Sequence, residues 1–329
     1  MLRSCPHCAS RNFATLLSEE TIRQETLLRA RFVADRVEKM PPQIERKDLT
    51  DFAHGRPASI LQCKPCSLLI RAEQHNGATE RYQDDPNDPG VMEHLFPRYV
   101  EAFRRKETPY RSLLPEGAQI LEIGSHFGAF LQVAAEWGWK GVGVDVGRDT
   151  SAFARAKGLE ICQGSLQDCD FPSAHFDAVF VWNCFEQIEE PHVMLAETKR
   201  VLQPGGLLVL RTPNALFYRI CEQFLARSPS GELATWVLRA LAYNNLLAFP
   251  YLYGYQCRTL VGIAKMHGFQ CAGRLNAEVI TLAFPVLFDW VLEELQATRA
   301  AMLGWSELLH FETMGALTGP WIEVFYRSV

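Results

Sequence analysis

The sequence predicts an α/β protein in which helices cover both faces of a mostly parallel sheet, with a small cysteine-rich module ahead of it. Three observations support this fold class. Strand and helix patterns alternate from residue 119 onward, a glycine turn follows the first of these strands, and two C-x-x-C units lie within the first 66 residues. Alternation of this kind is typical of a doubly wound sheet with crossover helices.

The composition is that of a folded globular protein. The 329 residues are 48% hydrophobic and 22% charged, and 33 Lys+Arg against 38 Asp+Glu give a net charge of −5. These values exclude a mostly disordered, collagen-like or coiled-coil chain. Neither half is basic enough to predict a nucleic-acid partner. The longest apolar segment, 233–253, contains Arg239 and Pro250, so we expect a buried or pocket-covering helix, with an interfacial helix as the alternative, and no transmembrane segment.

Four of the ten cysteines form two C-x-x-C units, Cys5 with Cys8 and Cys63 with Cys66. The N-terminus lacks the apolar stretch of a signal peptide, which predicts a cytoplasmic protein. In such a reducing compartment paired cysteines bind metal more often than they form disulfides. Two residues between thiolates let one tight turn direct both sulfurs to a single ion. We therefore predict a closed, structural zinc site with four thiolate ligands.

The distance between the two units is greater than in an ordinary zinc ribbon. A helix that starts at Ser18-Glu19-Glu20 and ends at Pro41-Pro42 accounts for it, so the module is interpreted as a ribbon with a helical insertion. Three alternatives stay open: chance spacing of reduced cysteines, a redox pair, and His7 in place of one cysteine. Further along, the turn-rich residues 83–90 mark a linker, and a helix is expected over 92–106.

The elements of the sheet follow in order. We expect strands at 119–123, 142–146, 161–163, 176–182 and 207–210, and helices at 129–137, 151–157 and 192–202, with a turn at Pro204-Gly205-Gly206 before the last strand. Gly124 permits a tight reversal after the first strand, and Gly128 lets the next helix start close to whatever lies over it. The freed backbone N–H groups can then face a polar ligand. Asp145, at the end of the second strand, is placed to accept the hydroxyls of a ribose.

Glu122 distinguishes between two possible classes of nucleotide-type ligand, a dinucleotide and S-adenosylmethionine. A dinucleotide site would prefer G-x-G-x-x-G, but this turn has His126 at the central position, and a carboxylate two residues before Gly124 would face the pyrophosphate unfavourably. The same carboxylate suits S-adenosylmethionine, because that ligand carries an ammonium and a sulfonium. The residues therefore favour S-adenosylmethionine.

With these motifs in place, residues 120–214 resemble a class I S-adenosylmethionine-dependent methyltransferase of the superfamily that includes ubiquinone and sugar methyltransferases. The matching segments are 120–128, Gly143-Val144-Asp145, 176–179, 202–208 and Thr212-Pro213-Asn214. Residues 260–269 resemble the last helix of the family, and 321–326 its closing edge strand. The resemblance implies a Rossmann-like, seven-stranded, mostly parallel sheet. The paired C-x-x-C units also resemble a zinc module that precedes some of these enzymes, sugar C-methyltransferases among them.

The resemblance also implies a set of cofactor-binding residues. They comprise the methionine-end contacts of the glycine turn, the ribose and adenine contacts, and one residue after the fourth strand: Glu122, Gly124, Ser125, His126, Phe127, Gly128, Asp145, Val146, Ser165, Leu166 and Asn183. Ser165 stands where relatives often have the adenine-binding Asp. Glu186-Gln187 stands where they often have Glu-His, so a histidine base is missing.

The sequence does not settle the catalytic residues. Methyl transfer to a hydroxyl or a carbon acid would need a general base, and the candidates are His126, Glu186 and Tyr255. His192 and His267 are interpreted as residues at helix ends.

Substrate choice is expected to come from the apolar insertions at 215–256 and 283–318, as a lid over a small acceptor or as the surface of a homodimer. We divide the chain into a zinc module (1–75), a linker with a helix (76–112) and a methyltransferase domain (113–329). The predicted function is methyl transfer to a small molecule such as a sugar, lipid, quinone or polyketide. The alternative is a zinc-module docking protein, or a methyltransferase acting on RNA or protein.

Overall fold

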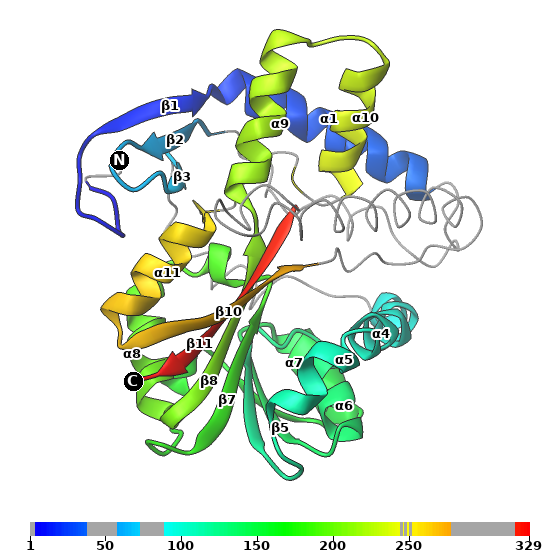
Figure 1. The fold of residues 1–329 in the computed structure, drawn as a ribbon. Coiled ribbons are helices and arrows are strands. Elements are labelled where there is room, and N and C mark those ends of the chain that lie inside the picture. The colour runs from blue at the N-terminus through cyan, green and yellow to red at the C-terminus, as the bar shows by residue number, and fades with distance from the viewer. Residues whose placement is uncertain are drawn as a thin grey trace.

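Two β-sheets organise the molecule. The computed structural model describes residues 4–37, 58–72, 89–243, 246, 249, 252–277 and 320–329. In this part of the chain a seven-stranded sheet has the order β10-β11-β8-β7-β4-β5-β6, and a four-stranded sheet has the order β1-β2-β3-β9 (Figure 1). No helix within these ranges is long and apolar enough to cross a membrane.

The larger sheet is the predicted doubly wound sheet. Its strands β4 to β8 pair in parallel, and β11 pairs antiparallel with both of its neighbours, β8 and β10. The strands are β4 (Gln119–Ile123), β5 (Lys140–Asp145), β6 (Glu160–Gln163), β7 (Phe176–Trp182), β8 (Leu202–Pro213), β10 (Phe269–Ala277) and β11 (Trp321–Ser328).

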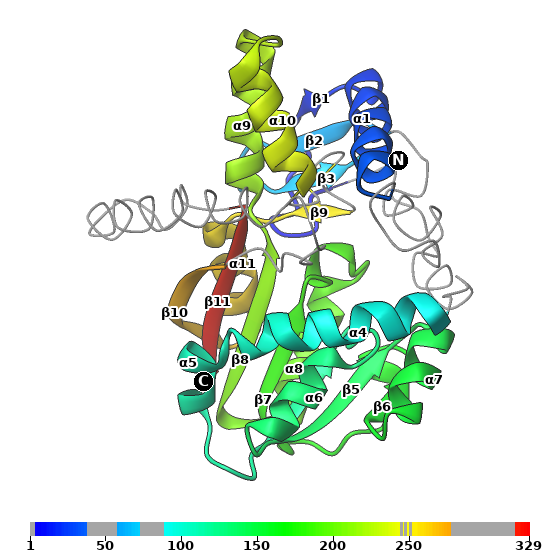
Figure 2. The ribbon, with the colours of Figure 1, turned by 90° about the vertical axis from the view of Figure 1, so that its right-hand side faces the viewer.

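Helices cover both faces of this sheet, with α4, α6 and α7 on one side and α8 and α11 on the other (Figures 1 and 2). The helices are α4 (Pro89–Arg104), α5 (Glu107–Tyr110), α6 (Ala129–Glu136), α7 (Arg148–Ala156), α8 (Pro191–Val201) and α11 (Cys257–Met266). Alternate residues of each strand enter the two cores. In β7, for example, Phe180 packs toward α4 and α6, while Val179 and Val181 pack toward α8 and α11.

The structure corrects two details of the sequence analysis. The strand expected at 207–210 begins at Leu202 and continues through the predicted glycine turn to Pro213, with Gly205 at φ 75°. The strand at 321–328 is not the edge strand, because β10 pairs on its other side. β10 and β11 form a long antiparallel ladder, which the sequence pattern alone does not indicate.

The smaller sheet belongs to what we call the upper lobe, which consists of β1, β2, β3, β9, α1, α9 and α10 and lies above the large sheet in Figure 1. The elements are β1 (Phe13–Leu17), α1 (Glu19–Val37), β2 (Ile60–Cys63), β3 (Leu69–Arg71), α9 (Ala215–Arg227), α10 (Glu232–Tyr243) and β9 (Tyr253–Gly254). The lobe thus joins the N-terminal module to the first predicted insertion. The second insertion, 283–318, lies outside the described residues.

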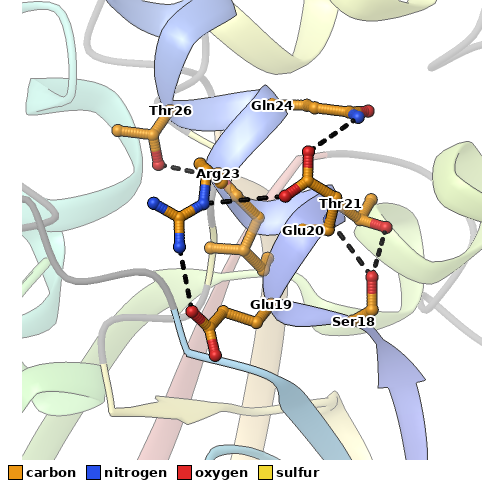
Figure 3. A network of polar contacts seen from close by, with 8 residues as sticks. Ser18, Glu19, Glu20, Thr21, Arg23, Gln24 and Thr26 are labelled. Atoms are coloured by element: carbon orange, nitrogen blue, oxygen red, sulfur yellow. Dashed lines mark hydrogen bonds and ion pairs between the residues drawn. The ribbon is translucent and has the colours of Figure 1, made fainter.

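The start of α1 is fixed as the sequence predicts. The Ser18 hydroxyl accepts a hydrogen bond from the Thr21 amide (3.2 Å), which caps one of the free N–H groups of the first turn. One turn further, Arg23 pairs with Glu19 and Gln24 with Glu20 (Figure 3). Both pairs have the i,i+4 spacing that stabilises an exposed helix by a few tenths of a kcal/mol.

The core of the upper lobe joins segments that are far apart in the sequence. Ile22 of α1, Ile60 and Leu69 of the small sheet, and Tyr218 and Leu241 of the insertion are buried in one cluster. Asn214, at the end of β8, caps α9 by accepting from the Leu216 amide (3.1 Å). The lobe is therefore connected directly to the carboxyl edge of the parallel strands, where open α/β sheets bind ligands.

Candidate functional site

The glycine turn between β4 and α6 has the tight reversal that the sequence predicts. Gly124 and Gly128 have φ 71° and 80°, and a Cβ added at Gly124 would lie 2.5 Å from the Cys184 Sγ. His126 also has a positive φ (50°), and its backbone rather than its ring fixes the turn. The exposed ring packs against Phe127 with 4.1 Å between centroids.

Asp145 anchors the turn to the end of β5. Its carboxylate accepts hydrogen bonds from the His126 amide (2.6 Å), the Gly147 amide (2.9 Å) and the Thr150 hydroxyl (3.0 Å). The side chain is half-buried, so it stays open to a ligand while its position is held. Val146 follows it, and Glu122 lies on the adjacent strand.

Glu122 is a buried carboxyl group with one unsatisfied oxygen. Only 3% of the residue is exposed, and neither its Oε2 nor the nearby Ser125 Oγ has a hydrogen-bond partner among the described residues. Burial raises the pKa of Glu122 well above its usual range, and the neighbouring Asp145 raises it further. A buried acid in this state gains strongly from a cation placed beside it. These features fit the ammonium end of S-adenosylmethionine.

The loop after β6 is tied at both ends. Ser165 donates from its amide and its hydroxyl to Asp168 (2.8 and 2.6 Å), which lowers the pKa of Asp168, and Leu166 is buried. Cys162 and Cys169 form a disulfide across this loop. This corrects the expectation that paired cysteines here are reduced or bind metal. No sequence pattern indicates this disulfide, because the two sulfurs meet only when β6 and the following 3₁₀ turn fold back on each other.

Asn183 follows β7 with its backbone in the left-handed region (φ 56°). Its Oδ1 accepts from Arg211, and its carbonyl accepts from Gln187 (3.1 Å). Arg211 is fully buried, stacks on Trp321 (4.3 Å) and pairs with Glu323 (3.2 Å). Lys106 and Tyr110 also bond Glu323. Sequence reasoning missed this network, since its members come from separate segments spread between residues 106 and 323.

Glu186 is a second buried acid, in the 3₁₀ turn Phe185–Gln187 that follows β7. Only 1% of it is exposed, its Oε2 has no partner among the described residues, and burial raises its pKa to about 7. The Tyr255 hydroxyl is also buried and without a partner in the described part of the chain. Burial and the nearby Tyr253 and Glu186 raise the pKa of Tyr255 well above its usual range. The third candidate, His126, lies at the exposed turn.

The four predicted metal ligands come together. The Sγ atoms of Cys5, Cys8, Cys63 and Cys66 all lie within 4.8 Å of one another, with Cys5–Cys66 and Cys8–Cys63 both at 3.5 Å. Tetrahedral zinc with Zn–S bonds of about 2.3 Å needs sulfurs about 3.8 Å apart. The cluster thus fits a four-thiolate zinc site, and His7 is not part of it.

The two C-x-x-C turns have matching backbone geometry. The first cysteine of each accepts a hydrogen bond from the amide four residues on, Ala9 to Cys5 and Ser67 to Cys63, both at 2.8 Å. Ala9 and Ser67 both have positive φ, 56° and 63°. Two separate segments with the same strained turn are typical of paired zinc knuckles rather than of chance spacing.

The knuckles are packed against the large domain. The Pro6 carbonyl accepts from the His192 Nε2 (2.7 Å), and the His192 Nδ1 lies 2.8 Å from the His267 Nε2. His267 is the C-cap residue directly after α11, as expected of a helix end. These two histidines therefore join the knuckle to α8 and α11 and lie apart from the cofactor turn.

Comparison with known proteins agrees with this geometry. Residues 121–210 match the family model described as "Methyltransferase domain". A probable S-adenosylmethionine-dependent methyltransferase of Mycolicibacterium smegmatis is 30% identical over 120 residues, covering 35% of this chain and 47% of the relative. A fatty-acid O-methyltransferase of the same organism is 35% identical over 97 residues, covering 28% of this chain and 35% of that protein.

The likeness extends to solved structures at low identity. A methyltransferase structure from Aquifex aeolicus matches with a TM-score of 0.45 and 15% identity, covering 74% of this chain and 100% of that chain. The chain spans about half of the length of the first curated relative, and about a third of the second. The match to the "Methyltransferase domain" model falls on the parallel strands β4 to β8 of the seven-stranded sheet.

Proposed function

We propose that the protein transfers a methyl group from S-adenosylmethionine to a small-molecule acceptor. The observation that carries this proposal is Glu122, a buried carboxyl with an unsatisfied oxygen beneath a glycine turn and one strand away from Asp145. A dinucleotide would bring a pyrophosphate to this position, where a carboxylate is unfavourable. An ammonium or a sulfonium is stabilised there instead.

We assign the residues around the glycine turn to different parts of the cofactor. When bound, the cofactor supplies an activated methyl group on a sulfonium. Glu122 and the turn Gly124–Gly128 hold the methionine end, Asp145 and Val146 the ribose and adenine, and Ser165 and Leu166 the far side of the adenine. Asn183, held by Arg211, borders the site from β7. The rest of the chain's contribution is alignment and the exclusion of water.

Glu186 is the best general base among the three candidates. A base works best with a pKa near the working pH, and the pKa of Glu186 is about 7. The pKa of Tyr255 is raised well above its usual range, so its hydroxyl stays protonated at neutral pH and does not act as the base. We therefore infer that Glu186 takes the proton from the hydroxyl of the methyl acceptor, and that Tyr255 orients this hydroxyl by a hydrogen bond.

The same proposal assigns zinc a folding role. A closed four-thiolate site has no open position for a substrate, and the knuckle surfaces at Pro6 and Cys66 are occupied by α8 and α11. This packing favours a structural module over a docking element. It supports the small-molecule hypothesis over the alternative of a docking protein or an enzyme acting on RNA or protein.

Calorimetric titration of the full chain with S-adenosylmethionine tests the function. We expect binding that Glu122→Gln and Asp145→Ala weaken by about tenfold or more each, the typical loss of a charge-assisted contact. Glu136→Gln is the matched control, because it makes the same change on the surface of α6, and it should bind as the unchanged protein does. Absence of binding by the unchanged protein would refute the proposal.

A further inference from the structure

We propose that the cysteine cluster positions the acceptor side of the active site, so that metal at Cys5, Cys8, Cys63 and Cys66 controls this side without controlling the cofactor side. The inference rests on the proposed function for the meaning of the two sides. The segment that connects them is 252–259, which we call the bridging segment. It comprises β9, the following turn and the start of α11.

The second knuckle bonds directly to the bridging segment. The Cys66 carbonyl accepts from the Thr259 hydroxyl (3.3 Å), and the next carbonyl, that of Ser67, accepts from the side-chain Nε2 of Gln256 (3.3 Å). Arg258 also donates to the Ser67 hydroxyl. Three successive contacts thus start at a metal ligand or at the residue after it. When a metal ion is bound, its bonds to the sulfurs of Cys63 and Cys66 fix the position of this turn.

The chain after the knuckle makes the second connection. Within five residues of Cys66 it becomes β3, which pairs with β9 through Leu69 and Gly254 and through Ile70 and Tyr253. The Arg71 amide adds a bond to the Leu252 carbonyl (3.0 Å). A Cβ at Gly254 would lie 2.9 Å from the Leu69 Cβ, so the two strands are in close contact. Any movement of the knuckle is transmitted to β9.

The bridging segment in turn contacts the residues that border the acceptor. The Leu252 amide donates to the Glu186 carbonyl (3.3 Å), and the Tyr253 hydroxyl donates to the Glu189 carbonyl (3.2 Å). The Tyr255 ring lies 4.8 Å from the Phe185 ring, centroid to centroid. The backbone of the proposed base and the side chain of its partner are therefore held from the direction of the metal site.

The cofactor side is held from a different direction. The bonds to Asp145 come from His126, Gly147 and Thr150, and the amides of Gly124 and Ser125 bond to the Val144 carbonyl. These contacts all lie within β4, β5, the loops that follow them and the first turn of α7. Loss of the metal should therefore loosen the acceptor side and leave the cofactor side formed.

Hydrogen exchange measured by mass spectrometry on the zinc-loaded and the chelator-treated protein tests this. We expect exchange of peptides covering 252–259 to rise about tenfold on chelation, as expected of local opening, while peptides covering 119–128 stay unchanged. The Kd for S-adenosylmethionine should change by less than about twofold. Adding zinc back should restore protection. Three results would each overturn the proposal. The purified chain holds no metal, exchange at 252–259 does not change on chelation, or cofactor binding is lost together with the metal.

A matched pair of variants tests the route without removing metal. Thr259→Val deletes the bond to the Cys66 carbonyl, and Thr198→Val makes the same change at a buried position of α8 whose hydroxyl contacts Met194 instead. Only Thr259→Val should raise exchange at 252–259 while metal content stays at one ion per chain. Equal exchange in both variants would contradict the route. Failure of the loaded protein to bind S-adenosylmethionine would refute the proposed function alone, because the exchange result does not depend on it.

Discussion

The cofactor edge and the upper lobe are built in opposite ways. We use the name cofactor edge for the part of the large sheet that carries the glycine turn 124–128 and Asp145. The cofactor edge comes from one continuous stretch, and the contact between His126 and Asp145 spans 19 residues. The upper lobe is assembled from three separate segments, and the Tyr218 hydroxyl bonds Glu25 across 193 residues. A region of the first kind is determined by local motifs. A region of the second kind depends on packing, so its changes should spread to distant residues.

The largest expected effect lies where the two regions meet, at Glu186. Glu186→Gln keeps the shape of the side chain and removes the base, so we expect turnover to fall by about 10²-fold or more. The Kd for S-adenosylmethionine should stay unchanged. In the unchanged protein, turnover of a hydroxyl acceptor should rise as the pH increases through about 7, because the ionised carboxylate accumulates. Steady-state kinetics measures the turnover and its pH dependence, on an acceptor found by screening hydroxylated compounds. If the variant kept the pH profile of the unchanged protein, Glu186 would not be the base.

The next effect tests the cofactor edge. Gly124→Ala places a Cβ 2.5 Å from the Cys184 Sγ and forces alanine to φ 71°, so urea unfolding should show a loss of about 3 kcal/mol. Gly117 has φ 79° with nothing within 4 Å, and Gly117→Ala should lose only about 1 kcal/mol through strain. Adding Cys184→Ala to Gly124→Ala should recover part of the difference, because it removes the Sγ but leaves the Cys184 Cβ at 2.9 Å. Equal losses at the two glycines would contradict the close approach.

The smallest effect tests the upper lobe. Burial and then the neighbouring Glu25 raise the pKa of Glu222 from 4.5 to about 9, while Tyr218 and Arg71 face the same cluster. The folded state keeps a proton that the unfolded state releases, so stability is lost as the pH rises between these values. We expect a loss of about 2 kcal/mol between pH 6 and pH 8.

The matched variants for this test are Glu222→Gln and Glu136→Gln. Glu222→Gln should remove most of the pH dependence measured by urea unfolding, because the amide does not titrate. Glu136→Gln changes an exposed residue paired with Arg104 and should leave that dependence in place. If both variants behave like the unchanged protein, Glu222 does not hold the proton.

The sequence predicted the cofactor edge well because each of its elements carries a local signal. The strand before Gly124, the turn and Asp145 lie close together in the chain, and the confirmed methyltransferase resemblance follows from them. The paired C-x-x-C units likewise predicted the cluster of four sulfurs. The individual cofactor contacts, the catalytic role of Glu186 and the boundaries at 75 and 112 stay predictions.

The sequence could not indicate contacts between distant segments. The β3–β9 pairing involves only two residue pairs, too short for a strand pattern, and β1 was not expected. The ion pair of Arg211 with Glu323 and the disulfide between Cys162 and Cys169 also left no pattern. Ordinary polar and cysteine residues acquire these roles only through their surroundings.

By itself, the sequence determined the fold class, the glycine turn with its two acids, and the four metal-ligand candidates, because periodicity and short spacings act locally. Only the tertiary structure decided that the N-terminal module and the insertion form one lobe above the carboxyl edge of the sheet. It also decided that Glu122 and Glu186 are buried with unsatisfied oxygens. Burial, and with it the pKa of each acid, is a property of the whole packed chain and cannot be assigned from neighbouring residues.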